Sequence, residues 1–229
     1  MSSIGTLSEK SLHAALKQWV AQPEDQFEVK IGRFVIDIVR DEQLIEIQTR
    51  HLYAMKRKLS VLLETHSIRL IHPIPHSKWI VKQTAAGSHV SRRKSPKRGS
   101  LLHIFGELVR IPHLLLHPNL TLEVLLTHQE EIWRDDGQGS WRRRGQSLHD
   151  HHLLDVVDRA VYRSASDYLA ILPETLAQPF TNKQLAKALK CKPRLATQIT
   201  YTLRHMELLE MVGKDGRSNL YQVIENLGT

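Results

Sequence analysis

Two acidic side chains near the start of the chain, Asp37 and Glu46, have surroundings suited to metal chemistry. Each stands between two isoleucines in a run of β-branched residues, which favours strands, and the polar residues 40–43 predict a tight turn. The hairpin would bring both carboxylates, with Gln48 on the face of Glu46, into an apolar sheet. Such a cluster is costly to bury unless a cation neutralises it, and oxygen ligands suit Mg²⁺ or Mn²⁺. The alternative is a plain hairpin whose two acids face solvent.

A family resemblance appears at these residues. Asp37, eight intervening residues and then Glu46-Ile47-Gln48 resemble the D…(D/E)-x-K signature of the PD-(D/E)XK nuclease superfamily. In that superfamily the two acids hold the metal ion, and the lysine orients or activates the attacking water. The resemblance implies that Asp37, Glu46 and the main-chain carbonyl of Ile47 would hold Mg²⁺ or Mn²⁺. Gln48 stands where the lysine is expected, so it would position the water.

The resemblance points to two further residues. Many members of the superfamily place an acid on the first helix, and Glu9 lies on the apolar stripe of a helix predicted over residues 6–22. The alternative is that Glu9 only closes a capping box. In some members the lysine has moved to the helix after the hairpin, predicted here over residues 50–65, so Lys58, or less favourably Lys56, could replace it. The alternative is that both lysines are solvated and flank the apolar face.

Composition and charge indicate the class of partner. The chain of 229 residues has a net charge of +8, fourteen histidines and a pI near 9.7, which predicts a polyanionic partner, most commonly nucleic acid. A basic membrane-surface protein is the rival interpretation. We expect no membrane span and no signal peptide, because neither kind of apolar run is present. The single cysteine, Cys191, allows no internal disulfide, which fits a reducing compartment such as the cytoplasm.

Two basic segments are candidates for DNA contact. Residues 85–100 depart in composition and read as a basic loop, with five cations in seven residues that suit phosphate contacts. The alternative is a disordered solvated loop. Farther on, Trp141 precedes an arginine run that could stack on a base and bind phosphates, unless it is a solvated turn. The predicted DNA-binding residues of the two segments are Arg92, Arg93, Lys94, Lys97, Arg98, Arg142 and Arg143.

The histidine-rich run 149–152 favours a structural interpretation over a metal site. Only His149 and His152 would share a face of a helix. We therefore expect Asp150 to cap a helix that continues to Val161, rather than the run to bind zinc.

The last sixty-odd residues look like a winged helix-turn-helix domain. Helices are predicted over residues 166–177, 182–190 and 193–207, followed by a hairpin over 208–224. Helix-turn-helix proteins place the third helix in the major groove of DNA. The alternative is a winged helix used for protein contacts. The residues expected to bind DNA are Lys192, Arg194, Gln198 and Arg204 on the third helix, with Lys214 and Arg217 in the wing.

The predicted order of elements also resembles the nuclease fold. A strand at 27–31, the hairpin, a helix and a strand at 68–74 predict a mixed sheet, because a strand–helix–strand crossover pairs its strands in parallel. Further strands are expected at 79–82 and 120–127. The sequence thus predicts an α/β fold, with a restriction endonuclease-like mixed sheet flanked by helices over residues 1–160 and a winged helix over 165–229.

The resemblance implies a metal-dependent DNA endonuclease that hydrolyses phosphodiester bonds. The alternative is a catalytically inactive nuclease-fold protein that binds DNA, or an adaptor in a DNA-processing complex. The sequence leaves open whether the protein forms a homodimer or has a protein partner in such a complex.

Overall fold

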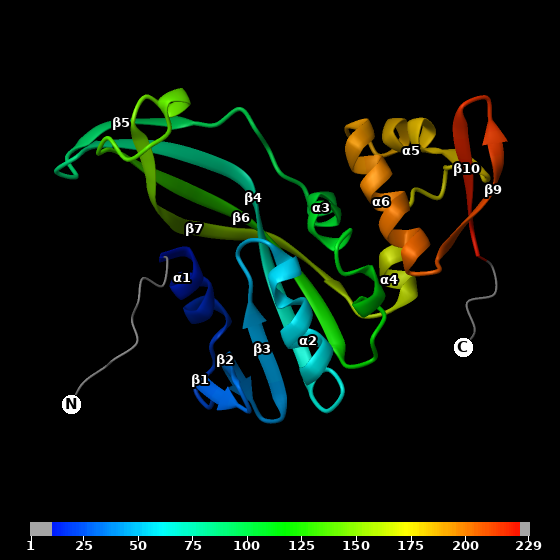
Figure 1. Cartoon of the computed structure of the whole chain (residues 1–229), viewed down its shortest axis with the longest axis horizontal. Helices are drawn as coiled ribbons and strands as arrows, with labels where there is room; N and C mark the ends of the chain where they lie inside the picture. The colour runs from blue at the N-terminus through cyan, green and yellow to red at the C-terminus, as the bar shows by residue number, and fades with distance from the viewer. Residues whose placement is uncertain (1–10, 225–229) are drawn as a thin grey trace.

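The alternating apolar residues of the chain build a mixed sheet of seven strands, which carries helices on both faces (Figure 1). The structure is a computed structural model, and it describes residues 11–224. The strands are β1 (Gln26–Ile31), β2 (Phe34–Arg40), β3 (Gln43–Ile47), β4 (Ser67–Thr84), β5 (His89–Lys94), β6 (Leu120–Asp135) and β7 (Gln146–Tyr162). The first helices are α1 (Ser11–Val20), η1 (Leu52–Met55), α2 (Lys56–Leu62), η2 (Leu101–Ile104), α3 (Phe105–Leu108), η3 (Pro112–Leu114) and η4 (Trp141–Arg143).

The order of the strands confirms the predicted mixed sheet. The strands lie in the order β1-β2-β3-β4-β6-β7, and β5 pairs with β4 beyond the end of β3. The β1–β2 and β2–β3 pairs are antiparallel, whereas β3–β4 and β4–β6 are parallel. The antiparallel hairpin is thus followed by a parallel strand, and η1 and α2 form the crossover between them. This helical crossover is shorter than the predicted helix over residues 50–65.

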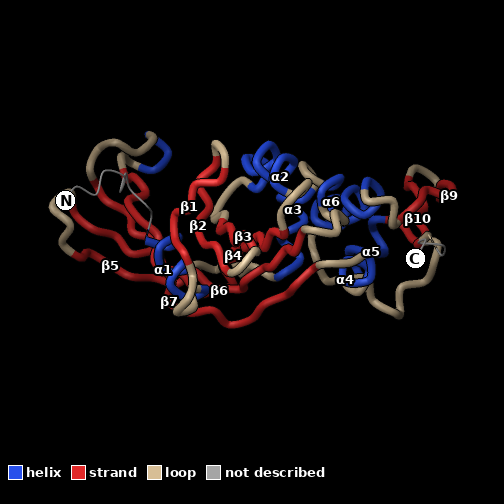
Figure 2. Tube along the Cα trace, turned by 90° about the horizontal axis from the view of Figure 1, so that it is seen from below, coloured by secondary structure: helices blue, strands red, loops and turns tan. Residues whose placement is uncertain are grey.

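Two apolar layers hold helices against the sheet. On one face, α1 packs through Leu12, Leu16 and Val20 against the isoleucines of β2 and β3, including Ile38 and Ile45. On the other face, α2 and α3 bury their side chains in a larger cluster with β4 and β6. Figure 2 shows the sheet from below with α2 and α3 gathered along one side. The hairpin that carries Asp37 and Glu46 therefore lies between two helical layers.

The long strands extend past these helices as an arm, at the upper left of Figure 1. The arm consists of the distal parts of β4, β6 and β7, together with β5 and η4. The prediction of two separate strands at 68–74 and 79–82 was wrong, because β4 is continuous over 18 residues. The prediction ended the strand at Pro73 and Pro75, because proline lacks an N–H donor. One edge of β4 pairs with β3 as far as Ile71 and with β5 from Trp79 onward. Both prolines lie between these two stretches, where that edge of β4 needs no N–H donor.

Two predicted segments of the arm have a different structure. Residues 89–94 form strand β5 rather than loop, because they pair with β4, and the charged side chains suit an edge strand. Residues 146–162 form strand β7 rather than a helix capped by Asp150. Pairing of β7 with β6 along its length, from Gln146 opposite Asp135 to Tyr162 opposite Leu122, overrides the local capping signal.

The C-terminal part is a three-stranded antiparallel sheet with helices. Its elements are α4 (Ala165–Leu169), β8 (Phe180–Thr181), α5 (Asn182–Ala188), α6 (Pro193–His205), β9 (Leu209–Asp215) and β10 (Ser218–Val223). Thr181 caps α5 as expected, in a capping box with Gln184. The helix predicted over 166–177 is only five residues long, and Pro173 lies in the irregular chain that follows it.

The C-terminal part shares its apolar core with the large sheet. Phe105 and Leu108 of α3 belong to the same buried cluster as Ile199 and Leu203 of α6. Near the junction the rings of Tyr162 and Tyr168 stack with centroids 4.9 Å apart. Within residues 11–224, no helix combines the length and the apolar character that a bilayer crossing would need.

Candidate active site

The predicted hairpin carries both acids at the point where its ladder ends. β2 and β3 pair from Arg40 and Gln43, across a two-residue turn, to Ile38 and Ile45. Asp37 and Glu46 come next in each strand. The Asp37 carboxylate accepts a hydrogen bond of 2.8 Å from the Ile47 N–H. The carboxylate therefore occupies the space between the two strands.

Helix α1 supplies further partners for Asp37. His13 Nε2 lies 3.3 Å from Asp37 Oδ2, and Lys17 Nζ lies 4.0 Å from Asp37 Oδ1. Lys17 also pairs with Glu28 on β1. Burial alone would raise the pKa of Asp37, but the hydrogen bonds from His13 and Ile47 and the charge of Lys17 hold it below its ordinary value. Asp37 is thus an ionised carboxylate near neutral pH.

Glu46 is more deeply buried and faces the other helical layer. Its exposed fraction is 4%, and Lys58 of α2 places Nζ 2.5 Å from Glu46 Oε1. Burial raises the pKa of Glu46 to about 7, with repulsion from Asp37 adding to the rise and Lys58 opposing it. A group that titrates near neutral pH beside a second carboxylate is the kind of perturbation found at functional sites.

The other predicted catalytic residues have different positions. The Gln48 amide donates to the carbonyl of Arg50, so its side chain follows the chain beyond β3. The N–H of Ile47 points toward Asp37, and because the N–H and C=O of one strand residue face the same neighbour, its carbonyl faces β2 as well. Glu9 lies outside the described residues.

The donors present suit a hard divalent cation. Mg²⁺ is commonly bound through one or two carboxylates, with water or substrate phosphate completing its shell. Asp37, Glu46 and the Ile47 carbonyl would supply only oxygen donors, as such a cation requires. Within residues 11–224 no three His, Cys, Asp or Glu side chains gather in a way that could hold a metal ion.

Sequence reasoning missed the polar residues of α1. His13 and Lys17 reach Asp37 from the same helix that Glu9 precedes. Their spacing from Glu9 by four and eight residues is the signal that could have found them, since residues four apart share a helix face. The stripe lies beside the apolar positions that anchor α1 to the sheet.

The arm brings the two predicted basic segments together. On β5, Arg92 and Lys94 both lie over the Trp79 ring, and Arg92 also pairs with Glu130. Near η4, Arg143 lies over Trp133 and Arg142 over the exposed Trp141. Arg93, Lys97 and Arg98 are exposed as well. β5 and η4, which are far apart in the sequence, thus lie on one arm (Figure 1), and each carries cations in contact with aromatic rings.

In the C-terminal part most of the predicted DNA-binding residues face solvent. Lys192, Arg194, Arg204, Lys214 and Arg217 are all exposed. Gln198 differs, because it is half-buried and lies against Gly106 of α3. One side of α6 therefore packs against α3, and its N-terminal end is exposed.

The fold and the site define a mixed α/β protein with a buried acid–lysine pair beside a second acid. Over residues 10–163 the chain matches the family DUF8091, a domain of unknown function, and it belongs to that family. It is also 31% identical over 228 residues to a protein of Treponema pallidum (strain Nichols) described as uncharacterized. That match covers 96% of this chain and 87% of the relative. No solved structure gives a significant match.

Proposed function

We propose that this protein is a metal-dependent DNA endonuclease, with a restriction endonuclease-like core and a C-terminal winged helix. The observation that carries the proposal is the contact of Lys58 with Glu46, next to Asp37 on the adjoining strand. Two acids and a lysine are the functional set of the PD-(D/E)XK superfamily, which this hairpin resembles. Here the lysine comes from α2, because Gln48 occupies the usual position.

The residues of the hairpin have separate roles in this proposal. Asp37, Glu46 and the Ile47 carbonyl would hold Mg²⁺ or Mn²⁺, which lowers the pKa of a bound water and offsets charge on the phosphate. Lys58 favours the ionised form of the buried Glu46 and has an ammonium group that can orient a water. His13 and Lys17 hold the Asp37 carboxylate in place from α1.

The basic surfaces support DNA as the substrate. The arm carries cations next to aromatic rings, a combination that suits phosphates and unstacked bases. The C-terminal part has the order of helices and hairpin found in winged helices, and the N-terminal end of α6 exposes Lys192 and Arg194. Winged helices of this order present such a helix to the major groove.

An inactive nuclease fold that binds DNA is the second candidate. Both acids already have basic partners, which favours this candidate. Lys58 pairs with Glu46, while Lys17 and His13 contact Asp37. The Gln48 amide is also directed at the Arg50 carbonyl. In that case the lysines replace the cation permanently, and the protein serves as a DNA-binding subunit or an adaptor in the cytoplasm.

Incubation with DNA separates the two candidates. Plasmid, linear and branched DNA are incubated with the pure protein in Mg²⁺ or Mn²⁺. We expect nicking or cleavage by the wild type, and loss of cleavage with retained DNA binding in Asp37→Asn and Glu46→Gln. Glu42→Gln is the matched control, because Glu42 is an exposed acid in the turn of the same hairpin. Absence of cleavage with every DNA and both metals would leave the binding function.

A further inference from the structure

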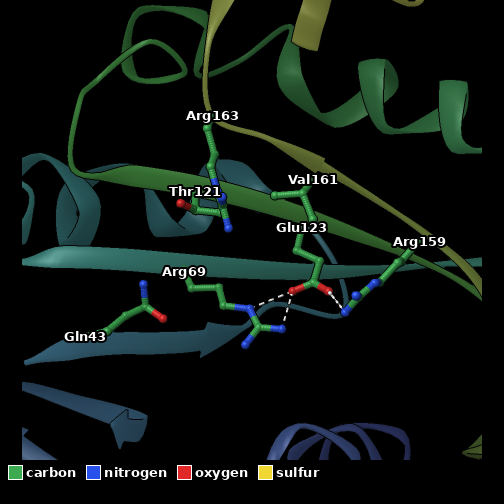
Figure 3. A pocket seen from close by; sticks show the side chains of 7 residues that line it. All are labelled: Gln43, Arg69, Thr121, Glu123, Arg159, Val161 and Arg163. Atoms are coloured by element: carbon green, nitrogen blue, oxygen red, sulfur yellow. Dashed lines mark hydrogen bonds and ion pairs between the residues drawn. The ribbon is translucent and has the colours of Figure 1, made fainter. Parts of the chain in front are cut away.

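A pocket of about 260 Å³ lies on the face of the large sheet to which α1 also packs (Figure 3). Arg69 and Glu123 share this face with Ile71 and Leu125, which α1 contacts, because alternate residues of a strand point the same way. The pocket spans four neighbouring strands. The polar residues that line it are Gln43 of β3, Arg69 of β4, Thr121 and Glu123 of β6, and Arg159 of β7 with Arg163 just beyond its end.

Glu123 anchors the pocket. It is 1% exposed, and its Oε2 accepts bonds of 2.6 Å from Arg69 Nε and 2.5 Å from Arg69 Nη2. Its Oε1 has no hydrogen-bond partner among the described residues, and it lies 3.7 Å from Arg159 Nη1. A buried carboxylate oxygen that accepts no hydrogen bond is costly, so its presence indicates a function in the pocket. Glu123 fixes the guanidinium of Arg69, and its Oε1 keeps the capacity to accept a hydrogen bond.

The arginines outnumber this single acid. Arg159 and Arg163 are exposed, and within residues 11–224 no hydrogen bond or ion pair is found for the guanidinium of Arg163. Figure 3 shows the Arg163 side chain pointing down toward Thr121 and the Arg159 side chain approaching Glu123. Three guanidinium groups and one carboxylate leave the empty pocket with a net charge of two positive.

We propose that this pocket binds a phosphate monoester group. A phosphate monoester carries a charge of about −1.5 to −2 near pH 7, which matches the excess of the pocket. A carboxylate or a phosphodiester carries a single negative charge and would leave one guanidinium uncompensated. Arginine forks bind phosphate through paired, charge-assisted hydrogen bonds. A ligand hydroxyl that reached Glu123 Oε1 could donate to it; a nucleotide carries both the phosphate and such a hydroxyl, whereas the 5′-phosphorylated end of a DNA strand supplies the phosphate alone.

Calorimetry with adenosine 5′-monophosphate and inorganic phosphate tests the proposal, at about 0.15 M salt so that distant charges are screened. A chelator is present, so the result is independent of the metal proposed at the hairpin. We expect Arg163→Gln and Arg159→Gln each to weaken binding about tenfold, the value of one charge-assisted hydrogen bond. Their thermal unfolding without phosphate should match the wild type, because both side chains are exposed. The matched control is Lys187→Gln, which removes an exposed charge on α5.

Competition identifies the source of the phosphate. If a 5′-phosphorylated oligonucleotide displaces bound inorganic phosphate and its 5′-hydroxyl form does not, the pocket is assigned to a DNA strand end. If adenosine 5′-monophosphate displaces the phosphate and neither oligonucleotide does, the pocket is assigned to a free nucleotide. The proposal is overturned if the wild type shows no saturable binding, or if both arginine variants bind as tightly as Lys187→Gln.

Discussion

Lys58 Nζ lies 2.5 Å from Glu46 Oε1 and also donates to the carbonyl of Val35, so one lysine of α2 contacts both strands of the hairpin. These contacts lie beside the point where the β2–β3 ladder ends and Asp37 accepts the Ile47 N–H. A lysine that only covered the apolar side of its helix would keep its charge in water. Here the Lys58 side chain is 16% exposed, and its ammonium group pairs with Glu46 instead of extending into water.

Lys58→Met should destabilise the protein at alkaline pH. The substitution leaves the buried Glu46 carboxylate without the Lys58 ammonium group, and breaking a buried pair in this way costs about 3 kcal/mol in comparable cases. Urea unfolding near pH 8 measures this loss. Lys56→Met is the control, because Lys56 is exposed two residues earlier on α2, and its change should stay within about 0.5 kcal/mol. Equal effects of the two substitutions would mean that the Lys58 contact is not formed.

The stability of the metal-free protein should depend on the ionisation of Glu46. Its pKa is about 7 in the folded chain against an ordinary value of 4.5, so the folded state binds more protons between these two values. The free energy of unfolding therefore falls as pH rises through this range, by about 3 kcal/mol. Glu46→Gln lacks this titration.

Urea unfolding at pH about 5 and about 8, with a chelator present, measures the prediction. The stability of Glu46→Gln relative to the wild type should rise by that amount between the two pH values. If the difference between variant and wild type is the same at both pH values, Glu46 has an ordinary pKa.

Single substitutions on the arm should have unequal effects on DNA binding. Arg92 is already paired with Glu130, whereas Arg93 is exposed on the same strand and alternates to the other face. We expect Arg93→Ala to reduce the salt dependence of binding by about one unit in the log–log slope, and Arg92→Ala to change it less. Titrations at several salt concentrations measure both slopes. Unchanged slopes in both variants would remove the arm from the DNA interface.

The third predicted helix should contact DNA only through its free side. Arg194 is exposed near the start of α6, whereas Gln198 lies against Gly106 of α3. Arg194→Ala should weaken duplex binding by about 1 to 3 kcal/mol without changing stability. Gln198→Ala should leave DNA affinity unchanged. Binding assays with the full-length chain compare the two variants, and an effect of Gln198 as large as that of Arg194 would require α6 to leave α3.

The sequence was sufficient to predict the β2–β3 hairpin and the parallel orientation of the strand that follows it. β-branched runs around Asp37 and Glu46 and the short polar turn are local signals, and the helix after them makes the next strand parallel. Lys58 was a candidate only through the superfamily resemblance, with a solvated lysine as the alternative, and its contact with Glu46 required the packing of α2 on the hairpin. The contacts of His13 and Lys17 with Asp37 required the docking of α1, which the local pattern does not specify.

The arm and the arginine pocket could not be predicted in the same way. Both depend on pairing between distant strands, such as Trp79 with Lys94 and Glu123 with Val161. Side chains on one strand face reveal little of their neighbours until the register is fixed, because the pairing partner decides which groups meet. The basic segment at 89–94 therefore appeared as a loop, and the cluster around Glu123 had no signature.

The affinity of the protein for Mn²⁺ at pH about 8 tests the central claim most directly, because the claim requires a metal between the two acids. Calorimetry should find a saturable site in the wild type and in Glu42→Gln, and no site in Asp37→Asn or Glu46→Gln. Binding should weaken as the pH falls below about 7, where protons compete for Glu46. Equal Mn²⁺ binding by Asp37→Asn and the wild type, or no saturable binding by either, would contradict the account.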